Sequence, residues 1–146
     1  VEEGSSQWSA IGDGVLILVS FLRDASLDAI PDVVKRLVEG KIFQGREQQG
    51  GRFNMLELGG DVMVVPQFCL AGKLKGKNVQ YHGALHRDRC REHYDCFVES
   101  LRQALDASGA ASSSDGTAPL LVCGVYGNRQ DMKVEADGPF THVLDL

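Results

Sequence analysis

Gly14-Val15-Leu16-Ile17-Leu18-Val19-Ser20-Phe21 is an almost unbroken apolar run near the start of the chain. Such a run lacks the polar alternation of a half-exposed strand, so it predicts a strand that is buried on both faces. Residues 61–65 repeat this pattern and end at Pro66, and residues 120–126 predict a third apolar strand. Three apolar strands therefore belong to the predicted sheet.

Two helices are predicted between these strands. Ser26 and Asp28 are N-cap candidates for the first helix, which carries Pro31 in its first turn and ends at Gly40. Its apolar residues recur at helical spacing. The second helix is predicted from about Arg87 to Ala107, where apolar residues form one stripe.

The end of the chain predicts a pair of strands. Residues 131–137 alternate between apolar and polar side chains, which is typical of a half-exposed antiparallel strand, and residues 140–144 return after a Gly-Pro turn. Because strands outnumber helices and the last two pair locally, we expect an α+β fold with a mainly antiparallel sheet or partial β-barrel flanked by two helices. The length of 146 residues predicts one domain over residues 1–146.

Composition and charge restrict the class of protein. The chain is 43% hydrophobic and 24% charged, as in ordinary globular proteins. With a formal net charge of -5, contact with nucleic acid has to come from a local basic patch. The longest apolar run, Val15 to Val19, is too short to span a bilayer, so no membrane partner is expected.

The cysteines indicate neither a metal site nor a disulfide framework. They have no C-x-x-C pair and no histidines at zinc-like intervals, so no metal and no cofactor are expected. Isolated thiols in apolar stretches predict free cysteines in a reducing compartment, and therefore a cytoplasmic protein. The four cysteines are Cys69, Cys90, Cys96 and Cys123.

Three short blocks stand out because their backbone, more than any reactive side chain, is the expected working part. They are Pro66-Gln67-Phe68-Cys69-Leu70, Tyr126-Gly127-Asn128-Arg129-Gln130 and Gly138-Pro139-Phe140-Thr141-His142. Taken singly, Pro66 would end a strand, Gln67 would cap it, and the Gly-Pro pair would make a turn. Between the first two blocks, three lysines in five residues predict either a solvated loop or a phosphate contact.

In combination these blocks resemble the D-aminoacyl-tRNA deacylases, and specifically their animal-type branch. That branch carries Pro-Gln-x-Thr-Leu, a Gly-basic-Leu-Lys-Gly-basic loop and Gln-Tyr-His. This chain has Pro66-Gln67, Lys73-Leu74-Lys75-Gly76-Lys77 and Gln80-Tyr81-His82, and YGNRQ and GPFTH follow toward its end. The chain departs from the pattern in two ways: Cys69 replaces the family's threonine, and the first strand of the family is missing or trimmed.

The resemblance implies hydrolysis of the ester that joins a D-amino acid to the 3′-terminal adenosine of tRNA, a proofreading reaction. In the animal-type branch, the implied substrates include L-alanine mischarged on a threonine tRNA. The 2′-hydroxyl of the tRNA is implied to accept the proton, and the backbone N–H groups of Phe68 and Cys69, oriented by Gln67, to hold the oxyanion. Pro66 is expected to line the same site.

The resemblance also implies a homodimer in which Gly138-Pro139 of one subunit enters the active site of the other. Main-chain carbonyls would then read chirality, and Arg129 would hold the trans form of the Pro139 peptide. Phe140 and Thr141 belong to the same substrate-binding block. The implied contacts with the acceptor stem and the 3′ end of tRNA come from Lys73, Lys75, Lys77 and Tyr81.

Two other functions stay open at this point. A non-catalytic nucleic-acid-binding module on the same fold would accommodate the replacement at Cys69 and the missing strand. A cysteine esterase would use Cys69 as nucleophile with His82 or His142 as base, whereas a structural Cys69 would be a small buried thiol lining the pocket. His86 and His93 lack metal-site partners and are both expected at the surface.

Overall fold

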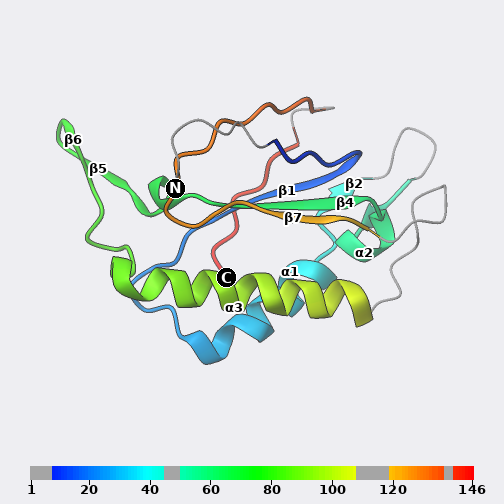
Figure 1. Cartoon of the computed structure of the whole chain (residues 1–146), viewed down its shortest axis with the longest axis horizontal. Helices are drawn as coiled ribbons and strands as arrows, with labels where there is room; N and C mark the ends of the chain where they lie inside the picture. The colour runs from blue at the N-terminus through cyan, green and yellow to red at the C-terminus, as the bar shows by residue number, and fades with distance from the viewer. Residues whose placement is uncertain (1–7, 45–49, 108–118, 137–139) are drawn as a thin grey trace.

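The computed structural model describes residues 8–44, 50–107, 119–136 and 140–146. The predictions made for Gly138 and Pro139 fall outside the described residues. The largest sheet in the described part has three strands in the order β1 (Gly14–Val19), β4 (Asp61–Pro66) and β7 (Leu121–Cys123), as Figure 1 shows. All three are parallel, with Leu16 opposite Met63 and Met63 opposite Val122.

The α+β class is confirmed, but the prediction of a mainly antiparallel sheet or partial β-barrel is wrong for the described residues. Continuous apolar runs are the pattern of parallel strands, and that signal outweighs the alternation near the chain end. Residues 131–136 and 140–146 form no strand in the structure. Antiparallel pairing joins β2 (Phe43–Gln44) to β3 (Arg52–Phe53) and β5 (Lys73–Lys75) to β6 (Asn78–Gln80).

Three α-helices are described where two were predicted. The predicted bounds of α3 (Arg87–Ala107) are confirmed, and α1 (Ile30–Glu39) follows the 3-10 turn η1 (Leu27–Ala29). The additional helix, α2 (Met55–Leu58), is a single turn. It forms because Asn54 and Glu57 make a capping box, in which each side chain accepts a hydrogen bond from the backbone N–H of the other residue.

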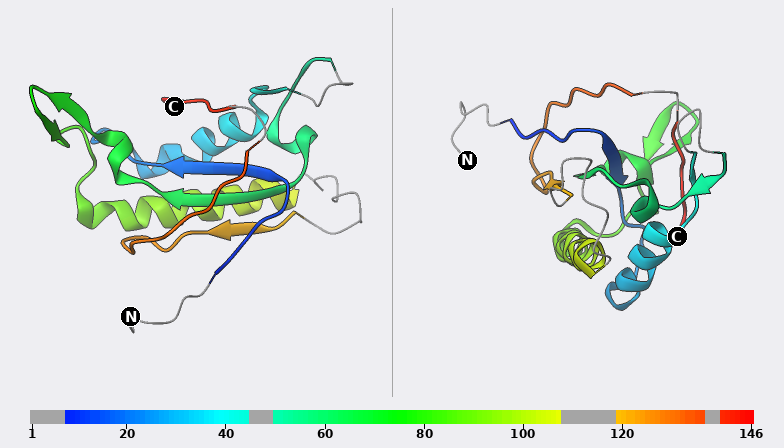
Figure 2. Two further views of the ribbon diagram at one scale, coloured as in Figure 1. Left: turned by 90° about the horizontal axis from the view of Figure 1, so that it is seen from above. Right: turned by 90° about the vertical axis from the view of Figure 1, so that its right-hand side faces the viewer.

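Helices α1 and α3 pack on one face of the three-stranded sheet, and the core lies between these layers (Figures 1 and 2). Each strand sends every second side chain into this core, as Val62 and Val64 do from β4. The alternate side chains, among them Leu18 with 39% of its surface exposed, face the other way. Burial of β1 on both faces, as predicted, is therefore not found within the described chain.

The parallel arrangement decides where the signature blocks meet. Because the three strands run in one direction, their carboxyl ends lie at a single edge of the sheet. The N–H of Gln67 donates to the carbonyl of Val19 at 2.8 Å, and the N–H of Gly124 donates to the carbonyl of Val64 at 2.7 Å. The chain after β4 and the chain after β7 are thus fastened side by side, although they are far apart in the sequence.

Candidate active site

The first signature block turns away from the sheet as a short 3-10 helix, η2 (Phe68–Ala71). Within it, the N–H of Leu70 donates to the carbonyl of Gln67 at 3.2 Å. The N–H groups of Phe68 and Cys69 lie in the first turn of this helix, where no helical carbonyl can accept from them, and no acceptor for either is found among the described residues. Two adjacent donors at the edge of the sheet are suited to hold a developing oxyanion.

The second signature block lies against the first through Gly124. A Cβ atom built on Gly124 would lie 3.2 Å from Cδ of Pro66 and 2.6 Å from Oε1 of Gln130, so only glycine fits here without a shift. The Val125 N–H donates to Oε1 of Gln130 at 2.9 Å, and Nε2 of Gln130 donates to the Val125 carbonyl at 3.2 Å. Arg129 is the residue of this block that was predicted to act at the site, whereas the side chain that closes the loop is that of Gln130, for which no role was predicted.

Helix α3 contacts the carboxyl edge of the sheet through two tyrosines, Tyr94 and Tyr126. The Tyr94 hydroxyl donates to the carbonyl of Gly124 at 2.8 Å and lies 3.3 Å from the carbonyl of Val64, and burial raises the pKa of Tyr94 above its ordinary value. The guanidinium of Arg91 lies 5.5 Å from the centroid of the Tyr126 ring and donates to the Tyr126 carbonyl at 3.2 Å. Burial raises the pKa of Tyr126 to about 12.

Cys69 is exposed, so the prediction of a buried thiol is wrong. A hydrogen bond with the Cys69 thiol raises the pKa of Tyr81. Neither candidate base forms a hydrogen bond with this thiol in the described part of the chain. His142 packs its ring against Phe140 at 5.5 Å, and His82 lines the neighbouring pocket.

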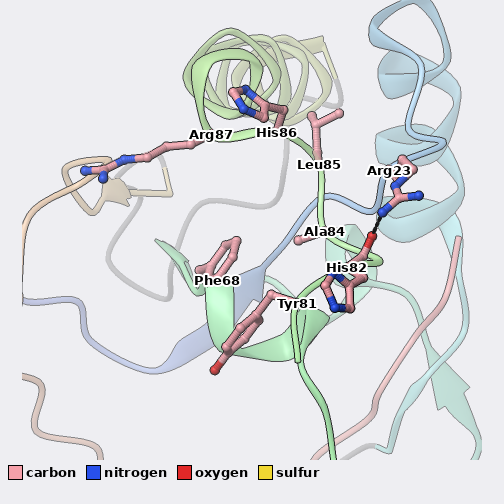
Figure 3. A pocket seen from close by; sticks show the side chains of 8 residues that line it. All are labelled: Arg23, Phe68, Tyr81, His82, Ala84, Leu85, His86 and Arg87. Carbon is pink, nitrogen blue, oxygen red and sulfur yellow. Dashed lines mark hydrogen bonds between the residues drawn. The ribbon is translucent and has the colours of Figure 1, made fainter. Parts of the chain in front are cut away.

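A pocket of about 390 Å³ lies beside η2 (Figure 3). One side is formed by the stacked rings of Phe68 and Tyr81, whose centroids are 4.7 Å apart at an interplanar angle of 29°. This approach depends on Gly72, because a Cβ atom there would lie 2.8 Å from Cε1 of Tyr81. The pocket therefore places Tyr81 next to the residue whose N–H group is a candidate oxyanion donor.

The predicted lysine-rich loop is in fact the hairpin β5–β6, which projects from the body of the protein in Figure 1. Side chains alternate along its strands, so Lys73 and Lys75 lie on one face and Leu74 on the other. Tyr81 lies on the same face as Leu74, because a Cβ atom built on Gly72, two residues before Leu74, would lie next to the Tyr81 ring. The residues predicted to contact tRNA thus divide between two faces, with Lys77 in the turn.

The remaining predicted residues are not brought against η2 by any hydrogen bond or ring contact in the described ranges. Arg129 and Thr141 are exposed, and Phe140, with 47% of its surface exposed, has its ring contact with His142. Gly138 and Pro139 lie outside the described residues, so the cross-subunit arrangement stays a prediction.

Comparison with known proteins decides the family. The family model described as D-Tyr-tRNA(Tyr) deacylase matches residues 1–145. D-aminoacyl-tRNA deacylase 2 of Danio rerio is 34% identical over 146 residues, which cover 99% of this chain and 87% of the relative. The chain belongs to the D-Tyr-tRNA(Tyr) deacylase family. The identity to a deacylase 2 supports its assignment to the animal-type branch.

Solved structures agree with the deacylase assignment. A probable eukaryotic D-amino acid tRNA deacylase superposes with a TM-score of 0.78 at 28% identity, covering 97% of this chain and 90% of that chain. The c-Myc DNA Unwinding Element Binding Protein superposes with a TM-score of 0.73 at 23% identity, covering 93% of this chain and 84% of that one. The second likeness shows the fold alone.

Two histidines of this deacylase-family chain differ in their surroundings. His86 is exposed beside Asp88 at 3.3 Å, which confirms its predicted surface position. The prediction for His93 is wrong, because its side chain is fully buried between the carbonyls of Arg89, 3.0 Å from Nδ1, and Ala25, 3.3 Å from Nε2. A signal was present in the sequence, since His93 falls in the apolar stripe of α3.

The deacylase-family chain shows no cluster of three or more metal-ligating side chains in its described residues. All four cysteines are free. No helix in the described ranges is both long and apolar enough to cross a membrane.

Proposed function

We propose that this protein hydrolyses the ester bond of D-aminoacyl-tRNA and so removes wrongly attached amino acids during translation. One observation carries the proposal: the adjacent N–H groups of Phe68 and Cys69 have no acceptor among the described residues and lie at the carboxyl edge of the parallel sheet. Membership of the deacylase family supports the choice of an aminoacyl ester as the substrate.

The proposed chemistry uses backbone donors and the substrate's own hydroxyl group. Water attacks the ester carbonyl carbon, the charge that develops on the carbonyl oxygen is held by the two N–H groups, and the tRNA 2′-hydroxyl relays the water proton to the departing 3′ oxygen. The C–O bond then breaks and leaves a free amino acid and tRNA. Loss of one such donor typically lowers kcat by about 10²–10³-fold.

A homodimer with Gly138-Pro139 entering the partner's site is part of the proposal. It is supported by the likeness to the deacylase family and by large apolar side chains that the described chain leaves exposed. Val143 is 90% exposed, and Leu18 on the outer sheet face is 39% exposed. Light scattering should give twice the chain mass, and a strictly monomeric active enzyme would contradict the cross-subunit arrangement.

The proposed substrate range includes L-alanine mischarged on a threonine tRNA, because of the likeness to the animal-type branch. In this proposal Arg129 holds the peptide before Pro139 in the trans form, with Phe140 and Thr141 beside the bound amino acid. An Arg129→Ala variant should lose activity on L-alanyl-tRNA more than activity on D-aminoacyl-tRNA. Equal losses on both would argue against a role in substrate range.

The proposed acceptor-stem contact uses the lysine face of the β5–β6 hairpin. Lys73, Lys75 and Lys77 concentrate positive charge on a chain whose formal net charge is -5. Each phosphate contact that is lost should lower the slope of log affinity against log salt by roughly 0.7–0.9. Replacing Lys75 with Gln should therefore weaken tRNA binding at low salt more than at high salt.

Release of amino acid from charged tRNA tests the function directly. Purified protein should release D-tyrosine from D-tyrosyl-tRNA, and Cys69→Ala should retain most of this activity, because alanine keeps the backbone N–H. Complete loss in Cys69→Ala with intact tRNA binding would favour a cysteine nucleophile. Salt-sensitive binding of tRNA without ester cleavage would instead identify a non-catalytic nucleic-acid-binding module.

Two further parts of the proposal concern the whole protein. We infer that residues 1–146 act as one domain, which agrees with the continuous family match over residues 1–145. A cytoplasmic location is supported by the four free cysteines, which a reducing compartment preserves.

A further inference from the structure

The pocket beside η2 combines an aromatic wall with positive charge. Phe68 is 49% exposed although its ring stacks on Tyr81, so part of its surface is open to a ligand. Stacking on aromatic side chains is the usual way in which proteins hold bases of single-stranded nucleic acid. A pocket of about 390 Å³ also falls within the range of small-molecule sites, roughly 300–1,000 Å³.

The lining of the pocket holds basic side chains and no acidic ones. Its eight residues include two arginines, Arg23 and Arg87, two histidines, and no aspartate or glutamate. The guanidinium of Arg23 donates to the carbonyl of His82, and this bond holds the Arg23 side chain at the rim of the pocket. The other N–H groups of the guanidinium remain able to donate to a ligand. Figure 3 shows Arg87 extending from the start of α3 away from the Phe68–Tyr81 pair and toward the loop after β7, so Arg23 is the cation nearer the aromatic wall. A flat ring joined to a phosphate matches this combination.

We propose that this pocket binds the nucleotide that immediately precedes the terminal adenosine of the substrate RNA. Its base would stack on the Phe68–Tyr81 pair and its phosphate would face Arg23 at the rim. This inference rests on the proposed function, because Phe68 takes part in both sites. Its N–H faces the ester carried by the terminal adenosine and its ring forms the pocket wall, so the preceding nucleotide is the adjacent part of the RNA.

Matched substrates of increasing length test the assignment. We would compare kcat/KM for the D-tyrosyl ester of adenosine, for the D-tyrosyl ester of the dinucleotide CpA, and for D-tyrosyl-tRNA. For the wild-type protein, the dinucleotide ester should be favoured over the adenosine ester by roughly tenfold, the order expected for one stacked base. Tyr81→Leu should bring this ratio close to one, whereas Tyr81→Phe, which keeps the ring, should preserve it.

Two further variants separate the phosphate contact from a general effect on the hairpin. Arg23→Gln should lower the dinucleotide preference and reduce its dependence on salt. Gln80→Leu changes the opposite face of the same hairpin and should leave the ratio of the two esters at the wild-type value. Circular dichroism of each variant would identify a folding failure, and Arg23→Gln tests the pocket independently of Tyr81.

Several outcomes would overturn the assignment. A wild-type protein that hydrolyses both small esters equally well is a deacylase without this nucleotide site. A Tyr81→Leu variant that changes the preference between D-tyrosyl and glycyl esters, with the ratio of dinucleotide to adenosine ester unchanged, would assign the pocket to the amino acid. A wild-type protein that cleaves none of the three substrates would remove the proposed function and this inference together.

Discussion

The hydroxyl of Tyr94 on α3 donates a hydrogen bond of 2.8 Å to the carbonyl of Gly124, the residue after β7. This contact joins the long helix to the sheet edge where the two signature blocks meet. The same hydroxyl lies 3.3 Å from the carbonyl of Val64 in β4. One side chain therefore holds the ends of two neighbouring parallel strands, and with them the backbone of the candidate active site.

Replacing Tyr94 with Phe should destabilise the protein. The change removes the donor to the Gly124 carbonyl, whereas the Val64 carbonyl keeps the N–H of Gly124, and an unsatisfied carbonyl inside the protein costs about 1–3 kcal/mol of unfolding free energy. Urea denaturation followed by circular dichroism would measure the loss. Tyr81→Phe is the matched control, because Tyr81 is near the surface and the same change there should stay within about 0.5 kcal/mol. Equal losses in both variants would show that the Tyr94 contact is not specific.

Gln130 should matter for activity through the loop that it closes. Gln130→Leu removes both hydrogen bonds to Val125, and the released loop should lower kcat/KM on D-tyrosyl-tRNA by about tenfold, the equivalent of about 1.4 kcal/mol. Gln130→Glu keeps the acceptor for the Val125 N–H but loses the donor to the Val125 carbonyl. Its activity should therefore lie between that of the wild-type protein and that of Gln130→Leu. If Gln130→Leu has wild-type kinetics, the loop is held by other contacts.

The buried His93 should be a stability residue, in contrast to His86 seven positions earlier. His93→Ala leaves a cavity and takes the imidazole away from the carbonyls of Arg89 and Ala25, and the expected loss of unfolding free energy is about 2–4 kcal/mol. His86→Ala, at an exposed position of the same helix region, should change it by less than about 0.5 kcal/mol. Thermal unfolding of both variants measures the contrast, and a stable His93→Ala protein would contradict the observed burial.

Stability should fall in alkaline solution because of Tyr126. Its pKa is about 12 in the folded protein, against an ordinary value of about 10 for an exposed tyrosine. The unfolded chain therefore loses its phenolic proton first, so the contribution of Tyr126 to stability is complete below about pH 10 and declines as the pH rises toward 12. Tyr126→Phe should flatten this decline in urea titrations between these pH values. An unchanged slope would argue against the raised pKa.

Local patterns in the amino-acid order were enough to predict the strands that begin at Gly14 and Asp61 and both ends of α3. They sufficed because apolar periodicity and proline or glycine punctuation act over a few residues. The signature blocks were also readable, and with them the family. The direction in which the strands pair could not be predicted, because the alternation over residues 131–137 describes a single strand and says nothing about its neighbour.

Properties that depend on distant contacts came from the folded arrangement alone. Burial of His93 and exposure of Cys69 follow from which neighbours pack around each side chain, and the grip of Gln130 on Val125 requires a loop already folded back. The pocket at Phe68 and Tyr81 exists because Gly72 lets a hairpin approach η2. Residue order sets which elements form. The meeting of parallel strand ends at one edge is a long-range effect, and it brings the backbone amides of Phe68 and Cys69 to that edge.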